Sequence, residues 1–276
     1  MTQAPTFKLA LVQMRVEPGR KDVNLPHAKE LVGRAASEGA HVVVLPEAMP
    51  LGWTHPTAST LADEIPGGQT CAVLRALARQ HRIFLCSGLV ERAGDKTFNA
   101  ALLVNPEGEI LLHHRKLNEL DIGQECYAQG DRLQVAHTPL GTFGVMICSD
   151  AFARGQIVSR VLGLMGAHII LSPSAWAVPA DHDNKRDPYG QLWRENYGPV
   201  ARDFRLWIAG VSNVGPITAG PWQGRNCIGS SLLVDPHGDA VLQGPYGVEA
   251  ETILCAQIQL APRPTRGDGW EQFWRT

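Results

Sequence analysis

Short apolar runs with the character of strands alternate with segments of helical spacing along the first part of this chain. The strand-like runs, rich in β-branched and other apolar residues, occupy 7–16, 41–45 and 83–90. Between them, 26–38 and 70–81 have the spacing of amphipathic helices, with Asn24 and Thr70 as expected N-caps. Because strands and helices that alternate in this way build sheets covered by helices, we expect a layered α/β fold.

Two predicted hairpins share one turn pattern. Asn-Pro-Glu-Gly at 105–108 joins strands at 99–104 and 109–114, and Asp-Pro-His-Gly at 235–238 joins strands at 232–234 and 239–242. Proline in second place and glycine in fourth suit a type I turn. The likeness of the two hairpins predicts two similar halves. Further strands are expected at 142–147, 168–171, 207–212 and 252–260, and helices at 156–165 and 189–205.

No stretch rich in Gly, Ser or Pro divides the chain. We therefore expect one domain over residues 1–276, with a core at about 7–260 and a C-terminal tail at 261–276. The tail contains Trp270 and Trp274. Two aromatic side chains on a short tail indicate a surface that docks on a partner.

Composition excludes several classes of protein. The formal charge is −2 and there is no run of basic residues, so nucleic acid is not an expected partner. No apolar stretch approaches the roughly 20 residues that span a membrane, and the first residues do not resemble a secretory signal. The six cysteines are widely spread, without a Cys-x-x-Cys pair that would indicate zinc. We expect a cytoplasmic protein with reduced thiols.

Three reactive side chains each follow a strand-like run. Glu47 follows 43–46, Lys116 follows 111–115, and Cys148 follows 143–147. In layered α/β folds such chain ends meet at one edge of a sheet, where chemistry is usually located. Alone, each residue also fits an ordinary structural role, as a surface acid, an edge-strand lysine or a buried cysteine. Their common position at strand ends favours a shared site.

In their order and context, these segments resemble the nitrilase superfamily, the carbon–nitrogen hydrolases with a Glu–Lys–Cys triad. Leu45-Pro46-Glu47, Arg115-Lys116-Leu117 and Cys148-Ser149-Asp150 are similar to the three segments that carry the triad, and the likeness continues through 166–176, 212–215 and 229–238. The resemblance implies a four-layer α-β-β-α sandwich, no metal or organic cofactor, and a homodimer or higher homo-oligomer. The helix after Cys148 and the aromatic tail are the expected interface.

The resemblance also implies a role for each residue. Glu47 is the general base, Cys148 is the nucleophile, and Lys116 with the backbone N–H of Ser149 stabilises an oxyanion. A cysteine–histidine dyad is the rival arrangement, since the chain has 10 histidines. None of them has a comparable motif around it.

The chain departs from the family pattern in one place. Many members carry a second glutamate after the lysine, and the usual spacing reaches Gly123 here. Glu119 and Glu125 are the available substitutes, and we expect Glu119 because it lies nearer to Lys116. Glu125 is expected to be a solvated loop residue.

The substrate-binding residues expected from the resemblance are Tyr127, Ser149 and Trp176, although a core position also suits Trp176. The polar loop at 179–188, with His182, is expected to shape access rather than to bind a metal. The expected reaction is hydrolysis of a non-peptide C–N bond in a small amide or N-carbamoyl compound, through a thioester. The alternatives are hydrolysis of a small nitrile and a non-catalytic binding protein of the same fold. An amide or carbamoyl substrate is favoured over a nitrile because Ser149-Asp150 follows Cys148. In nitrile-cleaving members of the family, Trp-Glu usually follows the cysteine.

Overall fold

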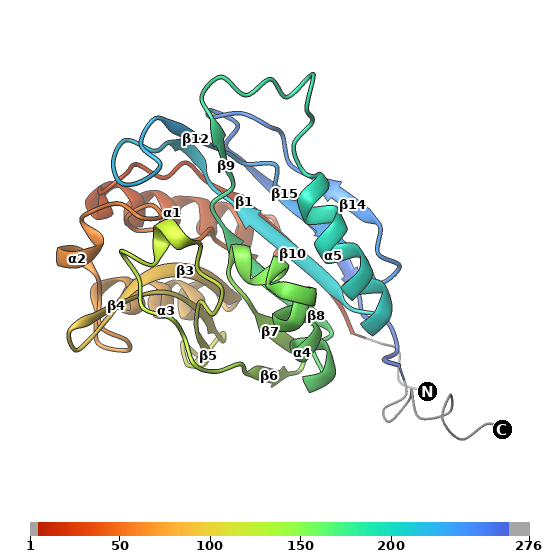
Figure 1. Ribbon diagram of the computed structural model, residues 1–276. Coiled ribbons are helices and arrows are strands. Elements are labelled where there is room, and N and C mark those ends of the chain that lie inside the picture. Colours follow the sequence, from red (N-terminus) through yellow and green to blue (C-terminus); the bar gives the residue numbers. More distant parts are fainter. Residues whose placement is uncertain (1–4, 265–276) are drawn as a thin grey trace.

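Two six-stranded sheets face each other, and two long helices cover the outer side of each (Figure 1). The computed structural model describes residues 5–264. The first sheet has the order β15-β1-β2-β3-β4-β5 and the second the order β14-β13-β10-β8-β7-β6. Helices α1 and α3 pack on the first sheet, and α4 and α5 on the second. The predicted α-β-β-α sandwich is confirmed.

The first sheet contains the strands that precede two of the candidate residues. Its members are β1 (Thr6–Gln13), β2 (Val42–Val44), β3 (Phe84–Ala93), β4 (Lys96–Val104), β5 (Ile110–Arg115) and β15 (Thr252–Gln259). The helices of this half are α1 (Lys21–Ser37), the short α2 (Ala58–Leu61) and α3 (Gln69–His81).

The second sheet contains the strand that leads to Cys148. Its members are β6 (Val135–Thr138), β7 (Gly141–Val145), β8 (Ile169–Ser174), β10 (Trp207–Ser212), β13 (Leu232–Val234) and β14 (Ala240–Gln243). Its helices are α4 (Ile157–Met165) and α5 (Gln191–Phe204), and a small third sheet is formed by β9 (Ala177–Pro179), β11 (Val214–Pro216) and β12 (Arg225–Ile228).

The two large sheets repeat one pattern, in agreement with the two similar halves expected from the hairpins. In the first, β1, β2 and β3 are parallel, and β4 and β5 continue as antiparallel strands. In the second, β7, β8 and β10 are parallel, and β13 and β14 continue in the same way. The turns that join each pair close as expected, with Gly108 N–H donating to Asn105 O and Gly238 N–H to Asp235 O.

The strands are apolar on both sides because one side faces the other sheet and the other faces a helix layer. In β1, Leu9 and Leu11 belong to the cluster between the sheets, whereas Ala10 and Val12 pack with α1 and α3. Each large apolar side chain buried in this way contributes about 1.5–3 kcal/mol. This burial, repeated over both sheets, fixes how their edges face each other.

Two expected helix caps are wrong. Helix α1 begins at Lys21, so Asn24 lies inside it, where its amide bonds the backbone of Glu17 and Pro50. Helix α3 begins at Gln69, and the hydroxyl of Thr70 donates to the Asp63 carboxylate instead of capping the helix. Both side chains are fully buried. Contacts to residues outside the helix therefore replaced the local capping bonds on which the prediction rested.

The strands β6, β9, β11 and β12 were not predicted, because they are too short to show a period. Trp270 and Trp274 lie outside the described residues. In residues 5–264, no helix is both long enough and apolar enough to cross a membrane.

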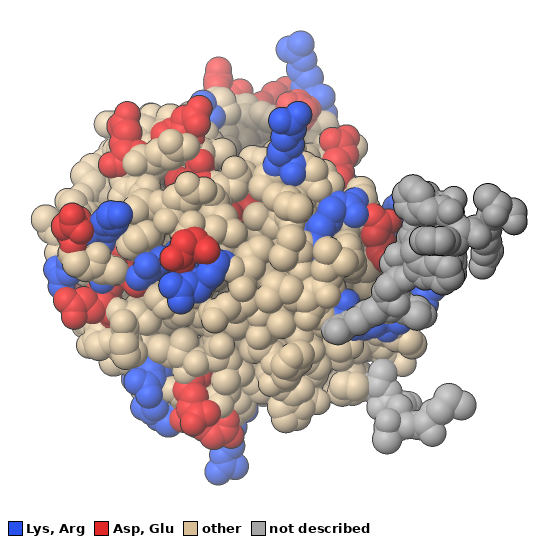
Figure 2. Space-filling view, turned by 60° about the horizontal axis from the view of Figure 1, so that its bottom comes forward, with Lys and Arg blue, Asp and Glu red and all other residues tan. Residues whose placement is uncertain are grey.

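Helix α4 presents apolar side chains to the outside. Ile157 and Leu164, two turns apart, are 56% and 67% exposed. Figure 2 shows the face brought forward from the bottom of Figure 1, where α4 and β6 lie, with a broad central area free of charged side chains. Such an area on a protein surface indicates a binding surface.

A buried carboxylate fixes the edge strand β5. Glu91 on β3 accepts hydrogen bonds from Arg115 at 2.5 and 2.8 Å and from His113 at 2.8 Å, and the Arg115 guanidinium lies over the Phe98 ring. Burial opposes ionisation, but these bonds and the charges of Arg115 and His113 outweigh it and lower the pKa of Glu91 to about 2. The position of β5, and of the chain that leaves it, therefore depends on an ionised Glu91.

Glu91→Gln should make the free energy of unfolding vary less with pH in the acidic range. The pKa of Glu91 is about 2 in the folded chain and about 4.3 in the unfolded chain. Ionised Glu91 therefore stabilises the fold fully above about pH 4.3, and this stabilisation is lost as the pH falls through about 2. The difference in the free energy of unfolding between wild type and Glu91→Gln should reach about 3 kcal/mol at neutral pH and shrink over that window. Urea unfolding at stepwise lower pH measures it, with Glu107→Gln on an exposed turn as control. A difference independent of pH would contradict this account.

Gly88 on β3 allows close approach of the chain after β2. A Cβ there would lie 2.5 Å from the Cα of Glu47 and 2.7 Å from the carbonyl oxygen of Pro46, both backbone atoms. Gly88→Ala should therefore lower the free energy of unfolding by about 1–3 kcal/mol, as overpacking does. Gly67→Ala is the matched control, since a Cβ at Gly67 meets nothing within 4 Å. Equal effects of the two substitutions in urea unfolding would show that the close approach carries no cost.

Candidate active site

The three residues predicted from strand ends meet in one cavity. Glu47 follows β2, Lys116 follows β5, and Cys148 follows β7 and begins a 3-10 helix that runs to Phe152. All three line a cavity of about 200 Å³. They are 1%, 2% and 9% exposed, respectively. Glu47 and Lys116 come from one sheet and Cys148 from the other, so the site forms where the two sheets face each other.

A hydrogen-bonded network surrounds the ammonium of Lys116. Its Nζ donates to Glu47 Oε1 at 2.8 Å and to Glu119 Oε1 at 2.9 Å. Asn99 Nδ2 donates to the same two carboxylates, at 2.7 Å to Glu47 Oε1 and 3.0 Å to Glu119 Oε2. The Lys116 backbone N–H also donates to the Asn99 carbonyl oxygen at 2.8 Å. Two carboxylates thus share one cation and one amide, and their positions are fixed together.

Burial and charge act in opposite senses within this network. Burial alone would lower the pKa of Lys116, but the charges of Glu47 and Glu119 outweigh it and hold that pKa above its usual value. Lys116 therefore stays a cation. For Glu47, burial raises the pKa of the carboxyl more than the charge of Lys116 lowers it, and the Glu119 charge adds to the rise. A carboxylate with a raised pKa is a better proton acceptor, which suits a general base.

Cys148 lies in a tight turn with a φ of +44°, a conformation that is rare for residues other than glycine. The pKa of its thiol is raised well above the usual value, first by burial and then by the negative charge of Glu47. The charge of Lys116 and the backbone N–H of Ala175 act against this rise. Since the neutral thiol predominates, the cysteine needs a base beside it to attack.

A buried aspartate connects the segments that carry Lys116 and Cys148. Asp150 Oδ1 accepts the backbone N–H groups of Leu117 and Asn118 at 3.0 and 2.8 Å. Its Oδ2 accepts Ile147 N–H at 2.9 Å and lies 2.8 Å from His114 Nε2. Asp150 is fully buried. One carboxylate therefore holds the turn of the cysteine against the loop after the lysine.

Glu119 fills the space beside Gly123. A Cβ at Gly123 would lie 2.7 Å from the carboxyl group of Glu119. Glu119 is 9% exposed and within hydrogen-bond distance of Lys116, as the sequence predicted, whereas Glu125 is exposed. The carboxyl group of Glu119 thus borders Gly123, the position at which the usual spacing would place an acid.

Two of the three expected substrate-binding residues line the cavity. Trp176 does so and stacks on Trp193, with ring centroids 4.5 Å apart, and Ser149 lines it beside the cysteine. Tyr127 does not belong to the lining. It is buried in a neighbouring apolar cluster, and its hydroxyl accepts the backbone N–H of Thr54 at 3.0 Å. The loop after Lys116 turns this ring away from the position expected for it.

Sequence reasoning missed several residues of the site. Asn99 carried a detectable signal, because it is the polar residue within the otherwise apolar run 98–104 of strand β4. Trp53, Trp193 and Trp222 line the cavity from three separate segments, and no motif marked them.

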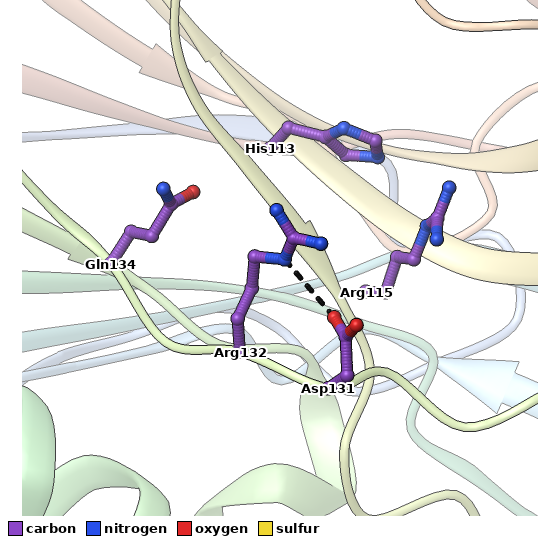
Figure 3. A pocket seen from close by; sticks show the side chains of 5 residues that line it. All are labelled: His113, Arg115, Asp131, Arg132 and Gln134. Carbon is purple, nitrogen blue, oxygen red and sulfur yellow. Dashed lines mark hydrogen bonds and ion pairs between the residues drawn. The ribbon is translucent and has the colours of Figure 1, made fainter.

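A second, polar cavity of about 180 Å³ lies beside β5 and shares no lining residue with the active-site cavity. Figure 3 shows its lining, with Arg132 joined to Asp131. Arg115, also in the lining, pairs with Glu91. Both arginines of this cavity are thus already neutralised by carboxylates. Within residues 5–264, no group of three or more His, Cys, Asp or Glu side chains is placed to hold a metal ion.

Comparison with known proteins agrees with this geometry. The pattern of the carbon–nitrogen hydrolase family matches residues 8–263. A nitrilase of Pyrococcus abyssi is 30% identical over 257 residues, which are 92% of this chain and 90% of the relative. Omega-amidase NIT2-A of Xenopus laevis is 30% identical over 270 residues, 92% of this chain and 89% of the relative.

Solved structures show the same fold. A carbon–nitrogen hydrolase from Helicobacter pylori G27 superposes with a TM-score of 0.82 at 23% identity, over 93% of this chain and 90% of that one. An amidase from Nesterenkonia sp. gives 0.76 at 21% identity, over 94% and 92%. With the family pattern across almost its whole length and relatives matched end to end, the chain belongs to the carbon–nitrogen hydrolase family of the nitrilase superfamily, as its motifs predicted.

Proposed function

We propose that this chain hydrolyses the C–N bond of a small amide or N-carbamoyl compound, with Cys148 as nucleophile, Glu47 as general base and Lys116 as the cation of the oxyanion site. The observation that carries the proposal is the buried Glu47–Lys116 pair, 2.8 Å apart, in the cavity that also contains Cys148. Such an arrangement gives the thiol a base and a fixed positive charge in a buried site.

The first half of the reaction forms a thioester. Glu47 takes the thiol proton as Cys148 Sγ bonds to the carbonyl carbon, and the carbonyl oxygen becomes an oxyanion. Lys116 and the backbone N–H of Ser149 stabilise that charge. When the tetrahedral intermediate collapses, the C–N bond breaks, and Glu47 gives the proton to the departing nitrogen, which leaves as ammonia or an amine.

The second half releases the acid. Glu47 accepts a proton from water, the resulting hydroxide attacks the thioester carbon, and a second oxyanion forms at the same place. Its collapse breaks the C–S bond, and the sulfur of Cys148 takes the proton back from Glu47. Glu119 acts on Lys116 throughout, since it shares the ammonium with Glu47 and keeps it placed while the Glu47 charge changes.

Hydrolysis of a small nitrile is the second candidate function, since one relative at 30% identity is named a nitrilase. Attack on a nitrile gives a thioimidate with the developing charge on nitrogen. An amide gives a tetrahedral oxyanion, for which Lys116 is better suited. The omega-amidase relatives support the amide.

Cys148→Ala should lower ammonia release from the best amide by at least about a thousandfold, because no thioester can form. Wild type should turn over that amide with a higher kcat/KM than the matched nitrile. Cys126→Ala is the control, since Cys126 is half-buried outside the cavity, and it should retain activity. A higher value for the nitrile would favour the second candidate, and full activity of Cys148→Ala would exclude the mechanism.

Glu119→Gln should lower kcat by about tenfold or more, the usual contribution of a positioned acid or base. The amide of glutamine keeps the size of the side chain but removes one of the two charges that hold Lys116. Glu125→Gln, the same change on the exposed part of the same loop, should leave kcat nearly unchanged. Steady-state kinetics of both variants measures these kcat values. A larger loss of kcat in Glu125→Gln than in Glu119→Gln would show that Glu119 is not the second acid.

We further infer a homodimer in which a second copy covers α4. The exposed Ile157 and Leu164 support this arrangement, and so does the broad area free of charged side chains on the face of the molecule in Figure 2. Leu164→Glu should then shift sedimentation from dimer to single chain, because it places a charge in the buried contact. Leu61→Glu on α2, at a similarly apolar exposed position, should not. A wild type that sediments as a single chain would contradict the inference.

A further inference from the structure

The wall of the active-site cavity is built from aromatic and aliphatic side chains. Tryptophan dominates it, with contributions from Trp53, Trp176, Trp193 and Trp222. The rest of the apolar part consists of Phe152, Tyr189, Leu120, Leu192, Ala175 and Ala177. The polar side chains of the lining are Glu47, Lys116, Cys148 and Ser149, which belong to the reacting end. The part of a substrate that extends beyond its amide therefore contacts rings and methyl groups.

The cavity is unsuited to an anionic group. Lys116 is the one Lys or Arg in its lining, and its ammonium is already shared between Glu47 and Glu119. Glu47 and Glu119 thus already hold this ammonium. A carboxylate brought in with the substrate would lose its hydration and find no second Lys or Arg side chain in the lining, which is costly in a buried place.

The cavity is equally unsuited to a cationic group, although tryptophan rings attract cations. The protein's own cations already occupy two of the rings. Lys116 Nζ lies 5.5 Å from the centroid of the Trp53 ring, and the Arg225 guanidinium lies 4.4 Å from that of Trp222. A third positive charge would have to compete with these two cations for the ring faces. A neutral group remains as the complement of the wall.

We propose that the substrate, on the basis of the amide hydrolysis proposed above, carries an uncharged apolar group next to its scissile amide, with a phenyl ring as the best fit. An apolar cavity of about 150 Å³ holds a benzene ring. The cavity here is about 200 Å³, which leaves room for the carboxamide that reaches Cys148. Trp176, Trp193 and Trp222 are the specificity-determining residues.

Three amides of similar length test the charge preference: phenylacetamide, succinamate and 4-aminobutanamide. Calorimetric titration of Cys148→Ala gives their affinities without turnover, and Cys148→Ser serves if the first variant does not fold. Phenylacetamide should bind at least about fiftyfold more tightly than either charged amide, because only it enters without an unpaired charge. Equal affinities, tighter binding of a charged amide, or no binding of phenylacetamide would overturn the proposal.

Turnover by the wild type separates this proposal from the function on which it rests. Ammonia release from phenylacetamide, with little from the other two, supports both. Faster turnover of succinamate or 4-aminobutanamide overturns the charge preference and leaves amide hydrolysis intact. Tight binding of phenylacetamide by Cys148→Ala, with no amide turned over by the wild type, overturns the hydrolysis and keeps the preference.

Leu192 offers a gain-of-binding test at the rim. It lines the cavity and is 49% exposed, so an arginine there can reach solvent and the cavity without disturbing the core. Leu192→Arg should raise the affinity for succinamate about three- to tenfold at low salt, as a partly solvated ion pair does, and should not raise that for phenylacetamide. Leu61→Arg, at an exposed leucine outside the cavity, should change neither. If Leu192→Arg leaves succinamate binding unchanged, the lack of a cation is not what excludes anions, and the proposal fails.

Discussion

A single buried ammonium organises the site. Lys116 is 2% exposed, and taking such a charge out of water costs several kcal/mol unless partners replace the lost hydration. Glu47 and Glu119 supply the opposite charge, and Asn99 donates to both of these acids in turn. Removing one member would leave a charge or a polar group unsatisfied in the interior, where the cost is highest. The four side chains therefore have to be placed together, and the backbone around them is built to do so.

The two sheets place these groups from opposite sides. Glu47 reaches its position because the chain after β2 runs directly over Gly88 of β3. Lys116 reaches its position because β5 is tied to Glu91 on β3. Cys148 arrives from β7 of the other sheet, and Asp150 joins its turn to the loop that follows Lys116. Packing of the two sheets is thus a condition for the site, since neither half alone contains both the cysteine and the charges.

The parts of the structure that could be predicted are those set by local pattern. Alternating strands and helices indicated the layers, and strand β10 was located to the residue. The positions of Glu47, Lys116 and Cys148 could be predicted because each follows a strand-like run within a motif similar to those of the family. The positions of side chains that depend on contacts outside the local pattern could not be predicted. Asn24 binds Pro50, Thr70 binds Asp63, and the Tyr127 hydroxyl lies against Thr54, so the rules of capping and spacing misplaced all three. The tryptophans of the cavity wall come from separate segments, and no sequence period marks them.

The raised pKa values of Cys148 and Glu47 fit one another under the proposed mechanism. A thiolate formed in advance would add a third negative charge beside Glu47 and Glu119, with only Lys116 to balance them. Burial therefore keeps the thiol neutral until a carbonyl carbon is there to take the electron pair, and the same burial makes Glu47 basic enough to accept the proton at that moment. The charge that appears on the substrate oxygen then lies near an ammonium that was already fixed. Under the proposed mechanism, the apolar cavity and the activation of Cys148 by Glu47 are in this way two results of the same burial.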